Sequence, residues 1–395
     1  MKFTILTQYY LPEIGAPQAR LSALVAGLLA RGHEVTVLTA LPNYPLGKIY
    51  AGYSGFYCEE TIQGAKVLRT FIYPTQKVAF IPRITSYLSF TLSSLLIGAI
   101  KLPASDYLLV ESPPLFLGFT AYILSKLKRA KFIFNVSDLW PESAVQLGVL
   151  APDSLMHRVS LAIEKFCYHQ SWLVTGQSRG IIEDIQQRFP DCHVFHLSNG
   201  VDTKLFVPTV GQSDDSTCTA TYAGLHGIAQ GLDQIISAAE LLRTENCRFV
   251  LVGDGPEKQE LKARAQRAAL NNVAFLDSKP KNEIPSLLAS ADILLVTLKK
   301  YIPGAVPSKL YEAMACGKPV IFVGEGEGAT IVKENNTGLV VIPGDITGLA
   351  DALRRLSREP ALRAELGNNG RQTAVSHFDR QNIISRFVDY LEKHL

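Results

Sequence analysis

Short apolar runs alternate with longer amphipathic segments along this chain. An apolar run at 2–7 is followed by a loop containing Gly and Pro at 11–17, and apolar residues then recur at helical spacing over 21–29. Gly32 ends that segment, and a second apolar run follows at 34–39. This order predicts a β–α–β unit, in which the two strands are parallel and the connection is right-handed.

The same pattern restarts in the second half of the chain, where a polar stretch at 210–216 precedes an apolar run at 219–223. Further strands are expected at 67–72, 107–111, 131–136, 172–175, 249–252, 273–276, 293–296, 320–323 and 338–341. The pattern predicts an α/β protein of two doubly wound Rossmann-like domains that bind ligands in the cleft between them, at the carboxyl ends of the strands.

Domain boundaries follow from the restart of the pattern. We place the N-terminal domain at 1–200 and the C-terminal domain at 201–375, and we expect 376–395 to form a helix that crosses back to the N-terminal domain. A chain of 395 residues is too long for one ordinary core, which agrees with this division.

Composition narrows the class of protein further. A net charge of only +3 argues against a dedicated nucleic-acid-binding protein, which would carry a much larger basic excess. The six cysteines are scattered without a C-x-x-C pair, which predicts reduced, mostly buried thiols in a cytoplasmic protein and no zinc site. The first six residues run straight into a strand and lack the cleavage site of a signal peptide.

One segment raises the question of a membrane. Residues 84–100 carry no charged side chain, while Arg83 precedes them and Lys101 follows them. A spanning helix needs about 20 predominantly apolar residues, and this segment is too short and too rich in Ser and Thr. Two interpretations remain: an ordinary helix packed on the sheet, or a helix whose outer face rests on the bilayer between its cationic flanks.

The segment 305–320 carries the clearest candidate chemistry. Pro307 and Ser308 indicate the start of a helix, and Ser308 is expected to cap its free amides. Such a helix start binds phosphate well, and Lys309 adds a full positive charge there. Glu312 offers a carboxylate suited to the hydroxyls of a ribose. These residues predict a nucleotide-sugar site, although Lys309 and Glu312 could also be solvated charges of an ordinary helix.

Several segments in a fixed order match a known family. They are the N-terminal strand with the Gly15 loop, 31–37, 198–202, 251–257 and 307–320. Through them the chain resembles, over essentially its full length, the retaining glycosyltransferases of family 4, which have the two-domain GT-B fold. Residues 138–142 and 306–309 resemble the subgroup that builds bacterial O-antigen, capsule and colanic acid, and there the chain is similar to L-fucosamine (N-acetyl-L-fucosamine) transferases.

The resemblance implies an activity and its partners. The donor would be a UDP-sugar, the acceptor an undecaprenyl-diphosphate-linked saccharide, and the location the cytoplasmic face of the inner membrane. Because negative charge develops on the departing diphosphate, fixed cations there are a strong catalytic lever. Lys309 and the amides around Ser308 would supply the positive charge, and Glu312 would bind the ribose. The chain contains no Asp-x-Asp, so we predict transfer without a metal or another cofactor.

Six further residues are candidates for the site. Gly15 would approach the diphosphate from the N-terminal domain, since a side chain there would block closure. Gly253 and Gly255, with the segment 277–283, would frame the base. Asp138 would orient a sugar or act as a base, with a helix N-cap as the alternative. Arg20 and His226 would face the phosphate, with a solvated surface arginine and a plain loop histidine as their alternatives.

The chain also departs from the family pattern. Gly304 stands where the first glutamate of the usual Glu-x7-Glu pair is expected, and Ser137 stands where a histidine is expected. The usual Arg and Lys of the second domain would fall near Leu225 and Gln230. Two other classes stay open: a sugar-nucleotide epimerase, which can share the same fold, and a nucleotide-sugar-binding protein without catalytic activity, which these departures would explain.

Overall fold

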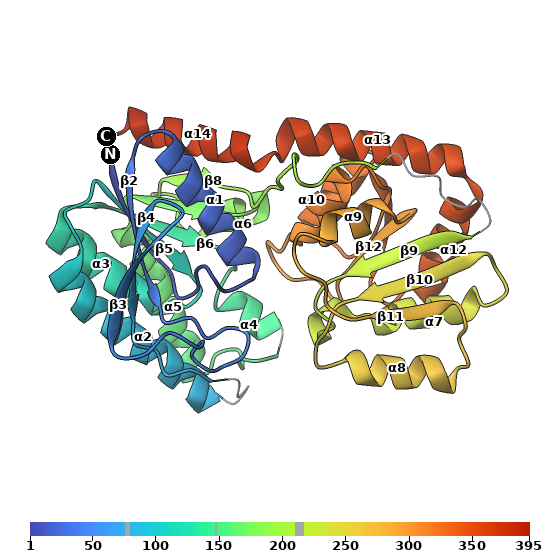
Figure 1. Ribbon diagram of the computed structural model, residues 1–395, viewed down its shortest axis with the longest axis horizontal. Coiled ribbons are helices and arrows are strands. Elements are labelled where there is room, and N and C mark those ends of the chain that lie inside the picture. The colour runs from blue at the N-terminus through green and yellow to red at the C-terminus, as the bar shows by residue number, and fades with distance from the viewer. Residues whose placement is uncertain (76–79, 147, 210–216) are drawn as a thin grey trace. The chain divides into compact units, whose positions relative to one another are not determined.

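The computed structural model describes residues 1–75, 80–146, 148–209 and 217–395, and the side chains of residues 80 and 81 lie outside the described set. The polar stretch expected at 210–216 also lies outside it. The chain divides into an N-terminal unit (1–199 and 381–395) and a C-terminal unit (200–380). Each unit is a Rossmann-like α/β domain (Figure 1), so the predicted fold class is confirmed.

The N-terminal unit is built on an eight-stranded sheet in the order β3-β4-β2-β1-β5-β6-β7-β8. Its strands are β1 (Lys2–Leu6), β2 (Glu34–Ala40), β3 (Tyr57–Ile62), β4 (Ala65–Thr70), β5 (Tyr107–Ser112), β6 (Lys131–Val136), β7 (Leu173–Gly176) and β8 (Val194–His196). All neighbours are parallel except β3 and β4. Strands covered on both faces are almost continuously apolar, which is why they stand out in the sequence.

Helices cover both faces of this sheet. They are α1 (Ala16–Ala30), α2 (Phe80–Lys101), α3 (Leu117–Lys128), α4 (Glu142–Gln146), α5 (Leu155–Gln170), α6 (Arg179–Arg188) and α14 (Arg380–Lys393). One hydrophobic cluster joins α1 and α14 to the sheet. A second cluster joins α2, α3 and α5 to it. The last segment of the chain therefore completes the N-terminal unit, where the Tyr107 hydroxyl donates to the Leu391 carbonyl at 2.7 Å.

The C-terminal unit is built on a six-stranded parallel sheet in the order β11-β10-β9-β12-β13-β14. Its strands are β9 (Cys218–Ala223), β10 (Cys247–Val252), β11 (Val273–Leu276), β12 (Ile293–Thr297), β13 (Val320–Val323) and β14 (Gly338–Val341). Its helices are α7 (Asp233–Leu241), α8 (Lys258–Arg267), α9 (Ile284–Ala289), α10 (Ser308–Ala315), α11 (Glu327–Glu334), α12 (Ile346–Arg358) and α13 (Pro360–His377), with a 3₁₀ turn at Ile228–Gln230.

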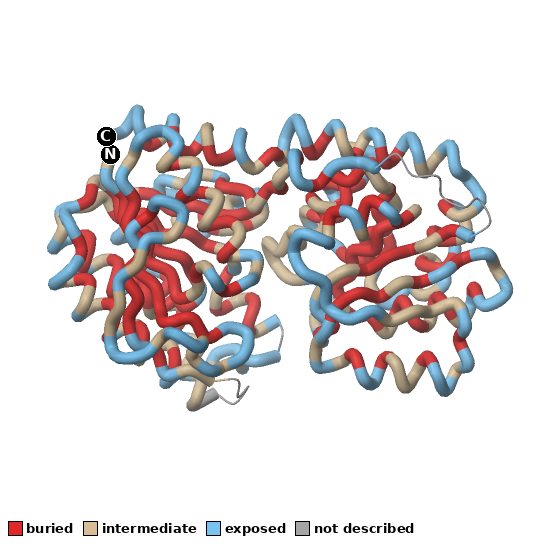
Figure 2. The backbone as a smooth tube through the Cα atoms, viewed as in Figure 1, coloured by how far each residue is buried: buried red, intermediate tan, exposed pale blue. Residues whose placement is uncertain are grey.

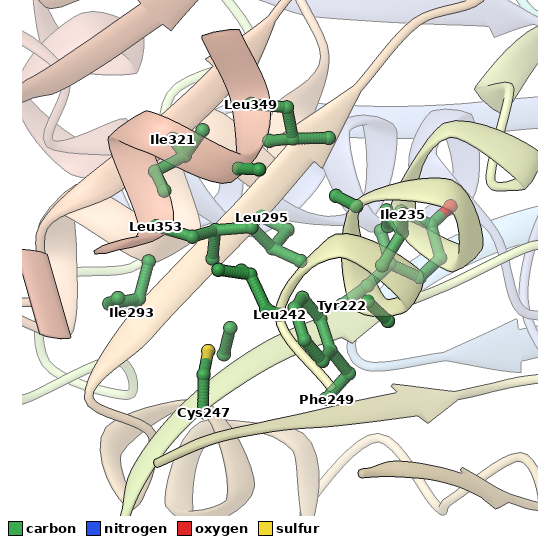
Figure 3. Packing of buried hydrophobic residues seen from close by; sticks show 14 of the residues in the cluster. Tyr222, Ile235, Leu242, Cys247, Phe249, Ile293, Leu295, Ile321, Leu349 and Leu353 are labelled. Carbon is green, nitrogen blue, oxygen red and sulfur yellow. The ribbon is translucent and has the colours of Figure 1, made fainter. Parts of the chain in front are cut away.

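One core cluster of the C-terminal unit lies between its sheet and helices α7 and α12, and a second includes α10. Figure 3 shows Phe249, Leu295 and Ile321 of the strands packed toward Ile235 of α7 and Leu353 of α12. Figure 2 shows both sheets buried along most of their length. All six cysteines are free thiols and four of them are buried, in agreement with the prediction from the sequence.

Most expected strands form within two residues of the expected bounds, but β3 and β8 were not predicted. β8 is only three residues long, and β3 alternates between partly buried and exposed positions, so neither has an apolar run. Among the described helices, one stretch, Pro82–Lys101 within α2, is long and apolar enough to cross a membrane by length and composition. Only 28% of its most apolar window is buried.

Candidate functional site

The N-terminus of α10 lies at the carboxyl edge of the C-terminal sheet. The helix begins at Ser308, and Pro307 occupies the N-cap position with no side-chain cap. The expectation that Ser308 caps the helix is therefore wrong, because Ser308 is already the first helical residue and its hydroxyl is not placed to accept from the following amides. The first-turn amides are thus left without a side-chain acceptor, as an anion site requires.

Lys309 folds back from α10 to the end of β9. Its Nζ donates to the Tyr222 hydroxyl at 2.6 Å and lies 4.2 Å from the centre of the Tyr222 ring. The same hydroxyl donates to the Leu225 carbonyl at 2.8 Å, which fixes its direction. Burial lowers the pKa of Lys309 to about 8, and Glu312 opposes that shift. The result is a cation held in a defined position.

Gly224 is needed for this arrangement. Its φ of +147° lies in the region that favours glycine, and a Cβ there would overlap Nζ and Cε of Lys309. Lys309 can therefore lie across the end of β9 only because residue 224 has no side chain.

Glu312 lies one turn after Lys309 on the same helix and is partly buried. Burial raises the pKa of its carboxyl, and the charges of Lys309, Arg380 and Lys281 oppose the rise. Lys309 and Glu312 form no ion pair with each other within the part of the chain that the structure describes. A carboxylate at this position is suited to accept hydrogen bonds from the hydroxyls of a ligand.

Two loops next to α10 contact each other through their backbones. His226 N donates to Asp254 O at 2.8 Å, and Glu257 N donates to His226 O at 3.0 Å. Gly253 and Gly255 permit this contact, because a Cβ at either position would overlap the backbone of the opposite loop. Both glycines also have positive φ, at +140° and +154°. Their demonstrable role is to hold these loops together at the ends of β9 and β10.

The side chain of Lys258 fixes the loop that carries Gly253 and Gly255. It is buried, and its Nζ donates to Gly253 O at 2.8 Å and to Asp277 Oδ1 at 2.7 Å. Asp277 begins the segment 277–283, which connects β11 to α9. This lysine ties the glycine loop to the segment that was expected to frame the base with it.

His226 is fully buried, with its ring centre 6.0 Å from that of Tyr222 and 6.3 Å from that of Phe275. Burial and the charge of Lys258 lower its pKa, so the imidazole is neutral near pH 7. It adds no positive charge to the site. Its expected contact with phosphate stays a prediction.

Arg20 lies in a buried polar network at the carboxyl edge of the N-terminal sheet. Its guanidinium forms an ion pair with Glu111 and donates to Ser137 Oγ at 2.9 Å and to Asn199 Oδ1 at 2.6 Å. Asn135 Nδ2 donates to the second Glu111 oxygen at 2.6 Å. The alternative of a solvated surface arginine is therefore wrong, since Arg20 is only 7% exposed.

Asp138 follows β6 directly beside this network. The residue as a whole is exposed, yet protein surrounds its carboxyl closely enough to raise its pKa to about 6. The charge of Glu111 adds to the rise, and that of Arg20 opposes it. The carboxyl therefore changes its charge near neutral pH, as a group that accepts a proton should.

The loop that carries Gly15 is fixed by a buried carboxylate. Glu13 accepts from the backbone amides of Tyr10 at 3.1 Å, Asn43 at 2.8 Å and Tyr44 at 2.8 Å. Gly15 has an extended φ of 177°, and a Cβ there would overlap only the side chain of Gln18. Its expected approach to the diphosphate stays a prediction.

The candidate residues thus form two groups. Ser308, Lys309, Glu312, His226, Gly253 and Gly255 gather in the C-terminal unit, and Gly15, Arg20 and Asp138 gather in the N-terminal unit. Sequence reasoning missed Tyr222, Glu111 and the network around Ser137. Each ends a strand or follows one, which was the available signal. Within the described ranges, no group of three or more His, Cys, Asp or Glu side chains could hold a metal ion.

Known families cover both units. Residues 15–200 match the model of the glycosyl transferase 4-like domain, and residues 212–373 match the model of glycosyl transferases group 1. Together with the fold, these matches define the class as a two-domain glycosyltransferase with the GT-B fold. Each unit thus matches a glycosyltransferase family, and the two matches together span most of the chain.

Two bacterial relatives carry provisional names as glycosyltransferases. The colanic acid biosynthesis glycosyl transferase WcaI of Escherichia coli K12 is 26% identical over 98% of this chain and 99% of its own length. The glycosyltransferase WbjE of Pseudomonas aeruginosa is 28% identical over 62% of this chain and 64% of its own length.

Solved structures share the fold at lower identity. A sucrose-phosphate synthase from Thermosynechococcus elongatus has a TM-score of 0.80 at 18% identity, covering 99% of this chain and 98% of its own. HepE of Anabaena, in complex with UDP and glucose, has a TM-score of 0.73 at 19% identity and covers all of both chains.

Proposed function

We propose that this protein transfers a sugar from a UDP-sugar to an undecaprenyl-diphosphate-linked saccharide, with retention of anomeric configuration. The transfer would serve bacterial surface polysaccharide biosynthesis, such as that of O-antigen or capsule, at the cytoplasmic face of the inner membrane. The donor sugar we propose is N-acetyl-L-fucosamine or a related amino sugar. One observation carries the proposal: Tyr222 holds Lys309 at the uncapped start of α10, one turn before Glu312.

The donor half of the reaction rests on the C-terminal unit. The bond between the anomeric carbon and the diphosphate oxygen breaks, and its electron pair leaves with UDP. Lys309 and the first-turn amides of α10 stabilise the charge that develops on the diphosphate. Glu312 accepts hydrogen bonds from the ribose hydroxyls. A fixed cation and amide dipoles supply electrostatic stabilisation without a metal, which supports a metal-independent transfer.

The acceptor half rests on the N-terminal unit. The acceptor hydroxyl oxygen forms the new bond to the anomeric carbon, and its proton passes to Asp138, which is ionised above a pKa of about 6. Arg20 and Glu111 act as positioning residues, because their buried ion pair also bonds Asn135 and Ser137, which precede Asp138 in the chain.

Names of relatives support the choice of substrates. HepE is described with UDP, with UDP-glucose, and with UDP and glucose. WcaI is provisionally assigned to colanic acid biosynthesis. A structural neighbour, WaaG, is described as involved in lipopolysaccharide biosynthesis and has a TM-score of 0.69. These names favour a UDP-sugar donor and a surface polysaccharide as product.

The first test is isothermal titration of the protein with UDP, GDP and ADP in the presence of EDTA. We expect selective binding of UDP that weakens at least about tenfold in Lys309→Ala and in Glu312→Ala, since each loses a hydrogen bond to a charged group. Lys333→Ala and Glu334→Ala, on the exposed side of α11, are the matched controls. Unchanged binding in the Lys309 and Glu312 variants would show that the nucleotide binds elsewhere.

A second test follows the donor itself. UDP-N-acetyl-L-fucosamine and UDP-glucose are incubated with and without a lipid-linked acceptor, and the anomeric configuration of the product is determined by NMR. Transfer that requires acceptor and retains configuration supports the proposal. Conversion of the donor without acceptor would indicate an epimerase, and binding without conversion would indicate a non-catalytic nucleotide-sugar-binding protein.

A further inference from the structure

Helix α2 carries its large apolar side chains on the outside of the N-terminal unit. Leu88, Leu92, Leu96 and Ile100 recur every four residues and are 40%, 61%, 57% and 73% exposed. Residues at this spacing lie on one face of a helix. A helix on the surface of a soluble domain normally turns such a face toward the core.

The inner face of α2 consists largely of small and hydroxyl-bearing residues. Ser86, Ser93, Ser94 and Gly98 are buried there beside Phe90. Ser93 Oγ donates to Thr70 Oγ1 at 3.0 Å, so the buried hydroxyl is satisfied within the unit. A Cβ at residue 98 would lie 2.7 Å from Leu124 Cδ1, so this glycine lets α2 pack closely on α3.

Helix α3 continues the same arrangement. Phe119, Ile123 and Leu127 are exposed, whereas Gly118, Thr120, Ala121 and Ser125 are buried. The two helices are neighbours (Figure 1), and Thr120 Oγ1 donates to Thr91 O at 3.0 Å. The seven large apolar residues that are exposed on α2 and α3 form what we call the outer apolar face: Leu88, Leu92, Leu96, Ile100, Phe119, Ile123 and Leu127.

The charges on α2 and α3 have one sign. Neither α2 nor α3 contains an acidic residue, and basic residues stand at their ends: Arg83, Lys101, Lys126, Lys128 and Arg129. An apolar surface bordered by cations is complementary to a bilayer that contains anionic phospholipids. It is less suited to a second copy of this chain, because a two-fold interface would bring like charges together.

The packing of α2 also decides its orientation toward a bilayer. Phe90 is fully buried in the core between the sheet and its helices, so one side of α2 is committed to the domain. Such a helix cannot be surrounded by lipid, as a spanning helix is. It can lie in the plane of the membrane with its exposed side in the interface.

We propose that the outer apolar face is the surface by which this protein lies on an anionic lipid bilayer. The apolar side chains enter the boundary between headgroups and acyl chains, and the flanking Lys and Arg contact phosphates. The inference rests on the proposed function only in that a lipid-linked acceptor gives the membrane contact its purpose.

Flotation of the full-length protein with vesicles tests the proposal. Vesicles of phosphatidylethanolamine and phosphatidylglycerol are compared with vesicles of phosphatidylcholine alone. We expect binding to the anionic vesicles that weakens at least tenfold in Leu92→Ser/Leu96→Ser and weakens further when Ile123→Ser is added. The matched control is Leu241→Ser/Val375→Ser, which changes two exposed apolar residues on helices of the C-terminal unit.

The outcomes separate this inference from the proposed function. Equal binding by the wild type and the α2 variant, or no binding by the wild type, would overturn the inference. Light scattering gives the oligomeric state of both proteins. A dimeric wild type and a monomeric Leu92→Ser/Leu96→Ser variant would also overturn the inference, because the face would then serve self-association. UDP titration of the same variants provides the second readout, because the nucleotide residues lie in the other unit. Vesicle binding without UDP binding would defeat only the proposed function.

Discussion

At the scale of single residues, the contact between Lys309 and Tyr222 determines the state of the main candidate cation. Lys309 is protonated below its pKa of about 8, so its attraction for a diphosphate is complete below that pH and is lost as the pH rises through it. We therefore expect kcat/KM for the donor to fall on the alkaline side at about pH 8, since this ratio reports groups of the free enzyme.

The substitution Tyr222→Phe separates the effect of the hydrogen bond to Lys309 from the effect of the ring contact. The ring contact at 4.2 Å remains, while the hydroxyl that accepts from Nζ at 2.6 Å is lost. A hydrogen bond to a charged group contributes about 1.5–3 kcal/mol, so the alkaline limb of the profile should move roughly one to two pH units lower. An alkaline limb that stays in place would mean that Tyr222 only packs against Lys309. Tyr390→Phe, in the N-terminal unit, controls for the loss of a hydroxyl elsewhere.

Asp138 gives a prediction on the acid side of the same profile. Its carboxyl has a pKa of about 6, so it is protonated below that value and accepts protons above it. We expect kcat/KM to rise as the pH passes through about 6. Asp138→Asn should remove this limb and lower kcat by roughly 10²–10⁴, the usual contribution of a positioned base. Asp153→Asn is the control. An acid limb that survives in Asp138→Asn would exclude Asp138 as its source.

These residues also show what the sequence could and could not predict about the site. Lys309 and Glu312 were predicted because a helix start and its charges are neighbours in the chain. Tyr222 is 87 residues from Lys309, and Glu111 is 91 residues from Arg20. Such pairs meet only because the carboxyl ends of parallel strands lie together. Without a known strand order, the burial of Arg20 could not be inferred from its position on a helix.

At the scale of elements, the two loops after β9 and β10 are held together by glycines. Gly253→Ala would place a Cβ against the Gly224 carbonyl, which is backbone and cannot rotate away, at a φ of +140°. We expect a loss of about 3 kcal/mol in the free energy of unfolding of the C-terminal unit, from backbone strain and overpacking. Thermal denaturation monitored by calorimetry measures it.

Gly344→Ala is the matched control for that substitution. Its φ of +90° is also unfavourable for alanine, but no atom lies within 4 Å of the added Cβ. It should cost only about 1 kcal/mol, the strain of the backbone alone. Equal losses in the two variants would show that contact between the loops does not matter.

Elements were predicted well where burial gives a strong pattern and poorly where it does not. The strands of both sheets were expected because their apolar runs reflect coverage on two faces. The direction in which α2 faces was left open, since its periodicity marks two faces without saying which one is inside. Only the burial of Ser93, Ser94 and Gly98 shows that the small residues face the sheet.

At the scale of the whole molecule, the N-terminal unit is made from two distant parts of the chain. Residues 381–395 join residues 1–199, and Ile384 of α14 packs against Gly27 of α1. The restart of the β–α–β pattern in the sequence predicted two domains. The last helix was expected to return to this unit, although by pattern alone an amphipathic helix at the end of a chain fits either domain equally well.

Removal of α14 should therefore destabilise the N-terminal unit, although the C-terminal unit is nearer to α14 in sequence. A chain that ends at Arg380 loses five buried side chains from the N-terminal core: Ile383, Ile384, Phe387, Val388 and Leu391. At about 2 kcal/mol each, their loss is comparable with the roughly 5–15 kcal/mol that stabilises a whole domain. We expect hydrogen exchange to become fast throughout β1, β2 and β5 in this variant, while β9, β10 and β12 stay protected and UDP binding persists.

A second truncation, after Glu392, distinguishes loss of the helix from loss of the terminus. It removes only the last three residues and keeps every buried apolar residue of α14, so exchange in both sheets should match that of the full chain. If truncation at Arg380 left the N-terminal strands protected, α14 would be an accessory helix and not part of the core. If it instead exposed the C-terminal strands, the helix would stabilise the unit that precedes it in sequence. If α14 is part of the core of the N-terminal unit, protection should be lost in the N-terminal strands alone.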